Sequence, residues 1–471
     1  MKNKAIYKFI GKVLIAFSIL LLFPIIVSII YKNNILPFII PFLISLILGL
    51  LLNKIKATNK VIYAKDGFII VSLSWIIISF ISALPFTING NANYIDSLFE
   101  AVSGLTTTGA SIMTNVEVLD KNILFWRSFM HFIGGMGVLA FVMAIIPLSK
   151  DDKSLHLLKA EMPGPNVSKL VPSVKKTLFY LYSIYLGLTT AELILLMFGG
   201  LNFFDAMLIS FGTAGTGGFS MLNTSLATYS TFSKWVVGIF MLLFGVNFNI
   251  YFLLMIRDFK SIYKSEELRT YIFIFIFALT IVLLNTYQSF ATFNEAVLNS
   301  FFHVSSLITS TGYSIGDINI YPTSSRVVCL GLMLISACAG STCGGFKISR
   351  LIICIKSIKR DILKVIHPNS VRTIYFENKK VSDDIVKNTC SFLFMYVLII
   401  IIIMFIVSFD ELGFETTINA VFCTFANVGL SFNITNFAEF SNLSKIVLSI
   451  GMLLGRLEIY PIVVLFSDLR K

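Results

Sequence analysis

The chain has 471 residues, of which 56% are hydrophobic and only 13% are charged. A soluble domain carries about 25% charged residues, so this composition excludes an ordinary soluble protein. The formal net charge of +12 does not indicate a nucleic-acid-binding protein, because the basic residues lie in alternate loops between apolar segments. The sequence therefore predicts an all-α polytopic membrane protein.

Two apolar segments come first, at 10–31 and 35–53. The first is too long for the apolar region of a signal peptide, and we expect both to be retained transmembrane helices. A pattern then occurs four times: a long apolar helix, a short amphipathic segment, a glycine-containing phrase and a second long helix. The long helices are predicted at 67–86 and 123–148, 177–199 and 234–256, 270–289 and 324–358, and 388–409 and 443–467. The short segments lie at 94–106, 203–214, 294–309 and 415–426.

This repeat predicts four consecutive helix–pore loop–helix units in a pseudo-fourfold arrangement, preceded by two transmembrane helices. The expected parts are 1–66 for the two N-terminal helices, 67–150, 151–260, 261–365 and 366–471 for the four units. The second helix of the third unit is expected to be broken.

The distribution of charge predicts the orientation. The segments 1–12, 53–66, 149–176, 257–270, 347–387 and 470–471 carry 30 of the 37 basic residues. The loops between them are neutral or acidic, with Asp96, Glu100, Glu117, Asp205, Asp317, Asp410, Glu411 and Glu439. By the positive-inside rule, both termini are expected in the cytoplasm.

The repeated phrases read TTTGAS, TGGFS, TSTGYS and NVGLS. The short segments before them cannot span a bilayer as helices, so we expect re-entrant loops that enter from outside. Irregular backbone at membrane depth must be buried in protein or line an aqueous path. Backbone carbonyls from four loops can replace the water shell of an alkali cation, and no carboxylate lies within any phrase. Packing of small residues between helices is the alternative for any single phrase, and the fourfold repetition disfavours it.

Several polar or flexible positions lie inside the apolar segments. Arg456 falls within the last span, where a charge must face a cavity or a partner, with Glu458 or a backbone carbonyl as the alternative partner. Arg127 lies near an outer helix end, where snorkelling to the interface is expected, and His131 and Glu192 are each expected to make an interhelical hydrogen bond. The third unit has a run of residues with poor helix propensity that is expected to line the pore or, alternatively, to serve packing. This run is Ala339, Gly340, Ser341, Thr342, Cys343, Gly344 and Gly345.

Three further stretches accompany the phrases: LFWRSFMHFIGGMGVLAF at 124–141, CAGSTCGGFKISR at 338–350 and GRLEIYPIVVLF at 455–466. Together they resemble the Trk/Ktr/HKT superfamily of potassium transporters over essentially the whole chain. The two extra N-terminal spans make the resemblance closest to the Trk-type membrane subunit. The resemblance implies potassium uptake across the inner (cytoplasmic) membrane through a carbonyl-lined selectivity filter. The filter positions would be Thr107, Thr108, Gly109, Thr216, Gly217, Gly218, Ser310, Thr311, Gly312, Asn427, Val428 and Gly429, of which Asn427 and Val428 depart most from the other phrases.

The resemblance also implies control and assembly. The run 339–345 would be a gating loop beneath the filter, and Arg456 would be a positive barrier. A homodimer on a separate cytosolic nucleotide-binding regulatory subunit is expected, with contacts to 149–176 and 347–387. Binding of anionic lipid is the competing explanation for the charge of these loops.

Other function classes are weaker. Potassium is the only ion cofactor expected, with no organic cofactor and no nucleic acid. The chain has no Walker-type phosphate loop, and no cluster of His, Asp or Cys predicts an enzyme. A sodium- or proton-coupled cation symporter is the alternative function, although consecutive units in one orientation differ from the inverted repeats common in such transporters.

Overall fold

The computed structural model describes residues 4–55, 64–137, 174–370, 372–434 and 436–469, and these ranges are predominantly helical. The N-terminal part consists of α1 (Lys4–Leu20), α2 (Leu22–Ile30) and α3 (Leu36–Asn53). The first unit has α4 (Ala64–Ile88), α5 (Tyr94–Leu105) and α6 (Lys121–Gly135). The second has α9 (Val174–Phe198), α10 (Phe203–Gly215), α11 (Thr231–Gly245), α12 (Phe248–Met255) and α13 (Phe259–Lys264).

The third unit has α14 (Glu266–Thr286), α15 (Phe293–Ile308), α16 (Thr323–Ile335) and α17 (Ile348–Ile366). A two-stranded antiparallel hairpin follows, with β1 (Tyr375–Phe376) and β2 (Lys379–Lys380). The fourth unit has α18 (Asp383–Val407), α19 (Phe414–Phe425), α20 (Asn442–Leu457) and α21 (Ile459–Leu469). Short 3-10 turns lie at Tyr287–Ser289, Ile318–Ile320 and Ser408–Asp410.

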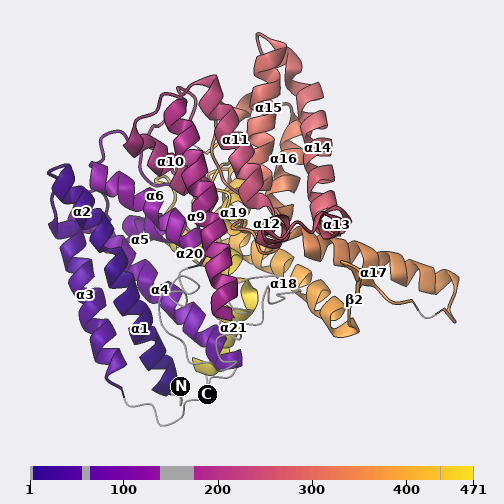
Figure 1. Ribbon diagram of the computed structural model, residues 1–471, viewed down its shortest axis with the longest axis horizontal. Coiled ribbons are helices and arrows are strands. Elements are labelled where there is room, and N and C mark those ends of the chain that lie inside the picture. Colours follow the sequence, from indigo (N-terminus) through magenta and orange to yellow (C-terminus); the bar gives the residue numbers. More distant parts are fainter. Residues whose placement is uncertain (1–3, 56–63, 138–173, 371, 435, 470–471) are drawn as a thin grey trace.

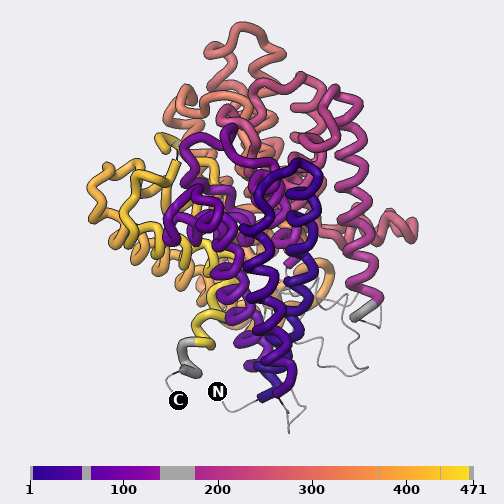
Figure 2. The backbone as a smooth tube through the Cα atoms, turned by 90° about the vertical axis from the view of Figure 1, so that its left-hand side faces the viewer, coloured from indigo at the N-terminus to yellow at the C-terminus, as the bar shows by residue number. Residues whose placement is uncertain are grey.

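The N-terminal helices pack as a layer on the side of the first unit (Figures 1 and 2). The α1–α3 contact is close because it has glycine on both sides. A Cβ on Gly11 would lie 2.8 Å from the carbonyl oxygen of Gly49. The hydroxyl of Ser45 also donates to the carbonyl of Leu14 at 2.8 Å. On the far side of the molecule, α14, α15 and α16 stand together, and α17 projects away from the body (Figure 1).

Length and composition support membrane insertion. Among the described residues, six helices are long and apolar enough to cross a membrane, or up to eight if each of two bent pairs counts as one span. The predicted helix 123–148 begins as α6 at Lys121, and its part beyond residue 137 lies outside the described residues. The same holds for most of the predicted loop 149–176. The predicted break in the third unit is present, because α16 ends at Ile335 and α17 begins at Ile348.

Two spans predicted as continuous are broken. The chain bends by 91° between α11 and α12 and by 115° between α20 and α21. At the first break, the amide of Phe248 donates to Gly340 and the carbonyl of Gly245 accepts from Cys338. At the second, Glu458 has a positive φ of 60°. The prediction of unbroken helices at 234–256 and 443–467 was therefore wrong, because hydropathy stays high across a bend whose backbone groups find partners elsewhere.

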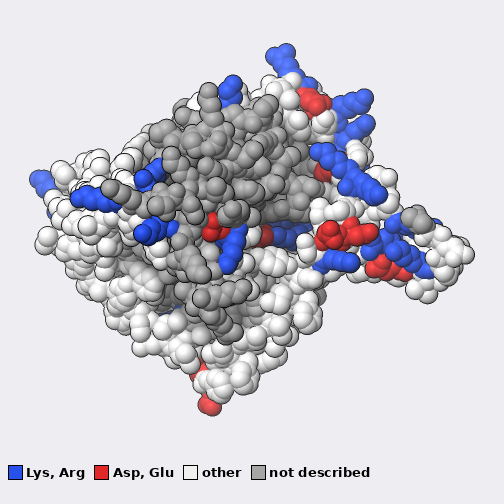
Figure 3. All heavy atoms as spheres, turned by 90° about the horizontal axis from the view of Figure 1, so that it is seen from below, with Lys and Arg blue, Asp and Glu red and all other residues white. Residues whose placement is uncertain are grey.

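Charge is uneven over the surface. Figure 3 shows the end where the first described turn of α1 and the last turn of α21 lie, with Lys and Arg side chains spread around it and along α17. The helices α14 and α18 present exposed apolar side chains instead, among them Phe273, Phe277, Phe394 and Phe405. This division is typical of a protein with a lipid-facing belt and a basic aqueous face.

Candidate functional site

The four glycine phrases share one backbone conformation. Each phrase glycine has a positive φ, an angle that glycine adopts without strain. The residue two positions before each glycine has a positive φ as well. The glycines are Gly109 (82°), Gly218 (75°), Gly312 (82°) and Gly429 (72°). The preceding residues are Thr107 (57°), Thr216 (55°), Ser310 (52°) and Asn427 (55°). One turn type is therefore built four times, each time directly after a short helix.

The tertiary structure closes these turns into a ring. A Cβ on Gly109 would collide with the carbonyl oxygen of Gly217, and a Cβ on Gly312 would collide with that of Val428. In the same way, Gly218 lies against the carbonyl of Thr311, and Gly429 lies against that of Thr108. Each phrase thus touches the next, and the fourth touches the first. At these four positions no side chain fits, so the contacts between neighbouring phrases are made by backbone.

The side chains of the ring depart from fourfold symmetry. In the first unit the Thr106 and Thr108 hydroxyls lie 2.8 Å apart, and in the third unit Thr309 and Thr311 do the same. The fourth phrase has no such pair; instead, the Asn427 amide donates to the Thr108 hydroxyl at 2.8 Å. The same amide nitrogen donates to the carbonyl of Met452 at 3.0 Å. Asn427, which replaces a hydroxyl-bearing residue in the fourth phrase, therefore connects this phrase to the first phrase and to α20.

The filter positions lie deep in the protein. All the hydroxyl- and amide-bearing residues predicted for the filter are fully buried: Thr107, Thr108, Thr216, Ser310, Thr311 and Asn427. Val428 is also fully buried. The structure therefore brings the twelve predicted filter residues together around one centre, although they come from four separate parts of the chain.

Polar side chains of the short helices form hydrogen bonds to the backbone of the turns. Nine residues before their glycines, Glu100 and His303 occupy equivalent positions on α5 and α15. Glu100 Oε2 accepts from the amide of Ile112 at 2.9 Å, and His303 Nε2 accepts from the amide of Ile315 at 3.4 Å. Both amides lie three residues after the glycine. Two of the four turns are therefore fixed by the same type of hydrogen bond.

A buried ion pair, which the sequence did not predict, also holds the first turn. Arg127 Nε lies 2.8 Å from Glu100 Oε1, and their side chains are 2% and 0% exposed. Arg127 also donates to the carbonyl of Ser220 at 3.0 Å and to the hydroxyl of Ser111 at 3.1 Å. The expected snorkelling of Arg127 was wrong, and Glu100 does not belong to an exposed acidic loop, because the two charges neutralise each other inside the protein. A detectable signal was an acid and an arginine in neighbouring apolar segments of one unit.

His131 on α6 connects the first two units. Its Nδ1 lies 2.8 Å from the carbonyl oxygen of Gly104, and its Nε2 accepts from the amide of Phe219 at 3.2 Å. Its ring fills the space where a Cβ on Gly217 would lie. The expected interhelical hydrogen bond is confirmed, and its partners flank the first and second phrases.

The predicted gating run lies directly against the ring. The amide of Gly344 donates to the Ser310 hydroxyl at 3.0 Å, and a Cβ on Gly344 would lie 2.7 Å from Cβ of Asn427. On its other side, Glu267 Oε1 accepts from the amide of Ala339 at 2.7 Å. The run therefore contacts two filter phrases and is held in place by α14.

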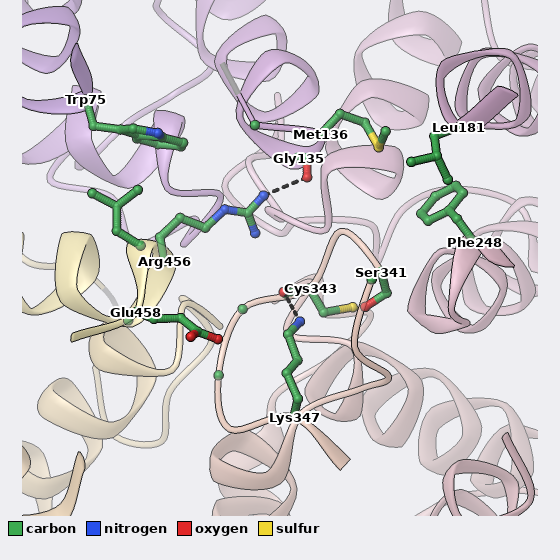
Figure 4. A pocket seen from close by; sticks show the side chains of 16 residues that line it. Trp75, Gly135, Met136, Leu181, Phe248, Ser341, Cys343, Lys347, Arg456 and Glu458 are labelled. Carbon is green, nitrogen blue, oxygen red and sulfur yellow. Dashed lines mark hydrogen bonds between the residues drawn. The ribbon is translucent and has the colours of Figure 1, made fainter. Parts of the chain in front are cut away.

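Arg456, on α20, forms hydrogen bonds to this run and to α6. One guanidinium nitrogen donates to the carbonyl of Thr342 at 2.6 Å, and the other donates to the carbonyls of Gly134 and Gly135 at 2.5 and 2.6 Å. Figure 4 shows the guanidinium pointing toward Gly135 at the edge of a cavity of about 40 Å³. Arg456 does not pair with Glu458, which binds Arg350 instead. Arg456 therefore joins the loop to the carboxyl end of α6, where backbone carbonyls lack helical partners.

The sequence model of TrkH, described as a cation transport protein, matches residues 32–470. This chain belongs to the TrkH family. It is 33% identical to the Trk system potassium uptake protein TrkH of Escherichia coli K12 over 485 residues, with 99% of each protein covered. It is 32% identical to the Trk system potassium uptake protein TrkG of the same organism, with 96% of this chain and 95% of TrkG covered.

The structural comparison agrees with this family. The crystal structure of the potassium transporter TrkH from Vibrio parahaemolyticus has a TM-score of 0.88 to this chain, with 28% sequence identity. The match covers 99% of this chain and 98% of that one. The predicted all-α membrane fold and the predicted resemblance to the Trk-type membrane subunit are confirmed. This TrkH-family chain is a multi-pass membrane transport protein and not an enzyme.

Proposed function

We propose that this TrkH-family protein carries potassium into the cell across the cytoplasmic membrane. The observation that carries the proposal is the closed ring of four identical backbone turns, in which each phrase glycine abuts a carbonyl oxygen of the next phrase. Rings of backbone carbonyls are the means by which proteins strip the water shell from potassium. The names of the relatives, Trk system potassium uptake proteins, agree with this chemistry.

Potassium would bind the carbonyls of the twelve filter residues. Each of the four short helices, α5, α10, α15 and α19, ends at a phrase, so its partly negative carboxyl end is directed toward the ring. No acidic residue lies within a phrase, which suits a filter that dehydrates a monovalent cation. Potassium is here the cargo, and the proposal needs no organic cofactor.

Flow through the ring would be controlled by residues 339–345 together with Arg456. The loop contacts Ser310 and Asn427 from the side where Arg456 holds it. A cation that leaves the filter on this side meets a guanidinium, and its passage requires the loop and Arg456 to move apart. Carbonyls of Thr342, Gly134 and Gly135 hold the arginine in place until then.

The regulatory partner would bind from the cytoplasm. The basic end in Figure 3 and the projecting α17 would face the cytoplasm, with both termini inside, as the positive-inside rule favours. We propose a homodimer with a cytosolic nucleotide-binding subunit that contacts 347–387 and 149–176. The relatives' names refer to a Trk system, which agrees with a membrane subunit that works with other components.

Ion flux in proteoliposomes at a fixed membrane potential tests this function. We expect potassium and rubidium to enter faster than sodium, down their electrochemical gradients. Equal flux of sodium and potassium would refute the proposed selectivity. Accumulation of potassium against its electrochemical gradient would favour the alternative, a sodium- or proton-coupled symporter.

A further inference from the structure

Lys347 is a second buried cation beside the loop. It directly precedes α17 and is 1% exposed. Its ammonium donates to the carbonyl oxygen of Cys343 (Figure 4). Arg456 and Glu458 both lie within electrostatic range of this ammonium.

Lys347 and Arg456 act on neighbouring residues of the loop. Arg456 donates to the carbonyl of Thr342, and Lys347 donates to that of Cys343, the next residue along. The residue after that, Gly344, donates its amide to Ser310 of the filter. The two basic side chains come from different units, α20 of the fourth and the start of α17 of the third. They therefore hold the loop from two sides immediately below the filter.

The charges that line this cavity are mainly positive. Among the described residues of its lining, Lys347 and Arg456 are basic and Glu458 is the acid. The carboxylate of Glu458 is bound by Arg350, whose guanidinium also lies 4.0 Å from the ring of Phe392. Because that carboxylate already has a cationic partner, it weakly offsets the field of Lys347.

We propose that Lys347 is a second electrostatic barrier residue, which opposes cation flow beneath the filter together with Arg456. The inference rests on the proposed potassium flux and assigns a further residue to its control. With an effective dielectric constant of about 20, one unit charge raises the energy of a cation roughly 12 Å away by about 1.4 kcal/mol, which corresponds to about a tenfold change in flux. Lys347 would slow cations even when Arg456 has moved aside.

Substitutions at Lys347 distinguish two roles: an electrostatic barrier to cations, and a hydrogen bond that only holds the loop in place, here called a tie. Lys347→Gln removes the charge and keeps an N–H donor, Lys347→Met removes both, and Lys347→Arg keeps both. A barrier predicts flux raised on the order of tenfold in the Gln and Met variants and little changed in the Arg variant. Lys359→Gln is the matched control, because it removes the same charge from an exposed position on α17, the helix that Lys347 precedes.

A change of opposite sign provides an independent variant. Glu458→Gln removes the acid of the cavity lining and leaves the guanidinium of Arg350 without its counter-charge, so the positive field rises and potassium flux should fall. The full-length protein is measured in proteoliposomes, and gel filtration in detergent verifies that each variant is folded. Unchanged flux in Lys347→Gln, or increased flux in Lys347→Met alone, would overturn the barrier in favour of a tie. Absence of potassium flux in the unmodified protein would instead count against the proposed function.

The potassium-to-sodium flux ratio gives a further readout. The atoms nearest to a Cβ placed on each of the four phrase glycines belong to the neighbouring phrases and not to Lys347. We therefore expect the ratio to stay unchanged in the Gln and Met variants while total flux rises. A fall in the ratio would show that the substitutions disturb the filter itself, and would overturn the assignment of Lys347 to the barrier.

Discussion

Removing the charge of Glu100 should destabilise the protein and widen the first filter phrase. Glu100 accepts hydrogen bonds from Arg127, Ser111 and the amide of Ile112. In Glu100→Gln, an amide NH₂ group faces donors, and Arg127 stays buried without its counter-charge. Breaking a buried ion pair on one side costs about 3–5 kcal/mol. We therefore expect an unfolding free energy lower by about this amount and a reduced preference for potassium over sodium.

The measurement combines thermal unfolding in detergent with flux of rubidium and sodium in proteoliposomes. Glu415→Gln is the control, because Glu415 pairs with Arg326 at 3.1 Å and is 58% exposed. An exposed pair contributes about 0–1 kcal/mol, so this variant should unfold like the unmodified protein. If Glu100→Gln were no more destabilising than Glu415→Gln, the reasoning about the buried pair would be refuted.

A double substitution sharpens the same test. In Glu100→Leu combined with Arg127→Leu, no charge stays buried, so the double variant should be more stable than the sum of the two single variants predicts. Selectivity should still fall, because the amide of Ile112 and the carbonyl of Ser220 both lose their partners. Additive losses of stability would show that the two side chains are not coupled.

Three further predictions concern the ring, the loop and the ion. Gly312→Ala places a Cβ against the carbonyl of Val428 at a φ of 82°, so potassium flux should fall to background while gel filtration still shows folded protein. Arg456→Ala, or a shortened loop at 339–345, should raise cation flux, because the positive charge or the plug below the filter is removed; unchanged or lower flux in a folded variant would count against the gate. Replacement of potassium by choline should lower thermal stability, by about 2.7 kcal/mol when potassium had been present at 100 times its dissociation constant. Equal unfolding temperatures in the two salts would contradict potassium binding in the folded state.

The sequence predicted well where one property recurs along a single segment. Apolar runs of about 20 residues identify spans because the bilayer fixes their length. Repetition identified the four phrases, and the small residues at 339–345 marked a break that the structure contains. These features depend on local composition, so tertiary contacts are not needed to recognise them.

Prediction failed where backbone or charge is satisfied by a distant partner. The bend before Phe248 is possible because Gly340, 92 residues away, accepts its amide hydrogen bond. Arg127 is buried because Glu100 lies on a different helix of the same unit. Neither partner is visible in hydropathy, which scores each residue as though lipid or water were its only surroundings.

The sequence by itself determined the class of the protein: a polytopic membrane protein with four related units, each with a short helix and a glycine turn. Only the tertiary structure decided that the four turns meet as one closed ring, with Gly429 against Thr108 completing it. It also decided which polar groups brace the ring and which hold the loop beneath it. The physical reason is that the phrases are roughly one hundred residues apart, so their contacts depend on the packing of whole units. The departure of the ring from fourfold symmetry also comes from contacts between units distant in sequence, such as the hydrogen bond from Asn427 to Thr108.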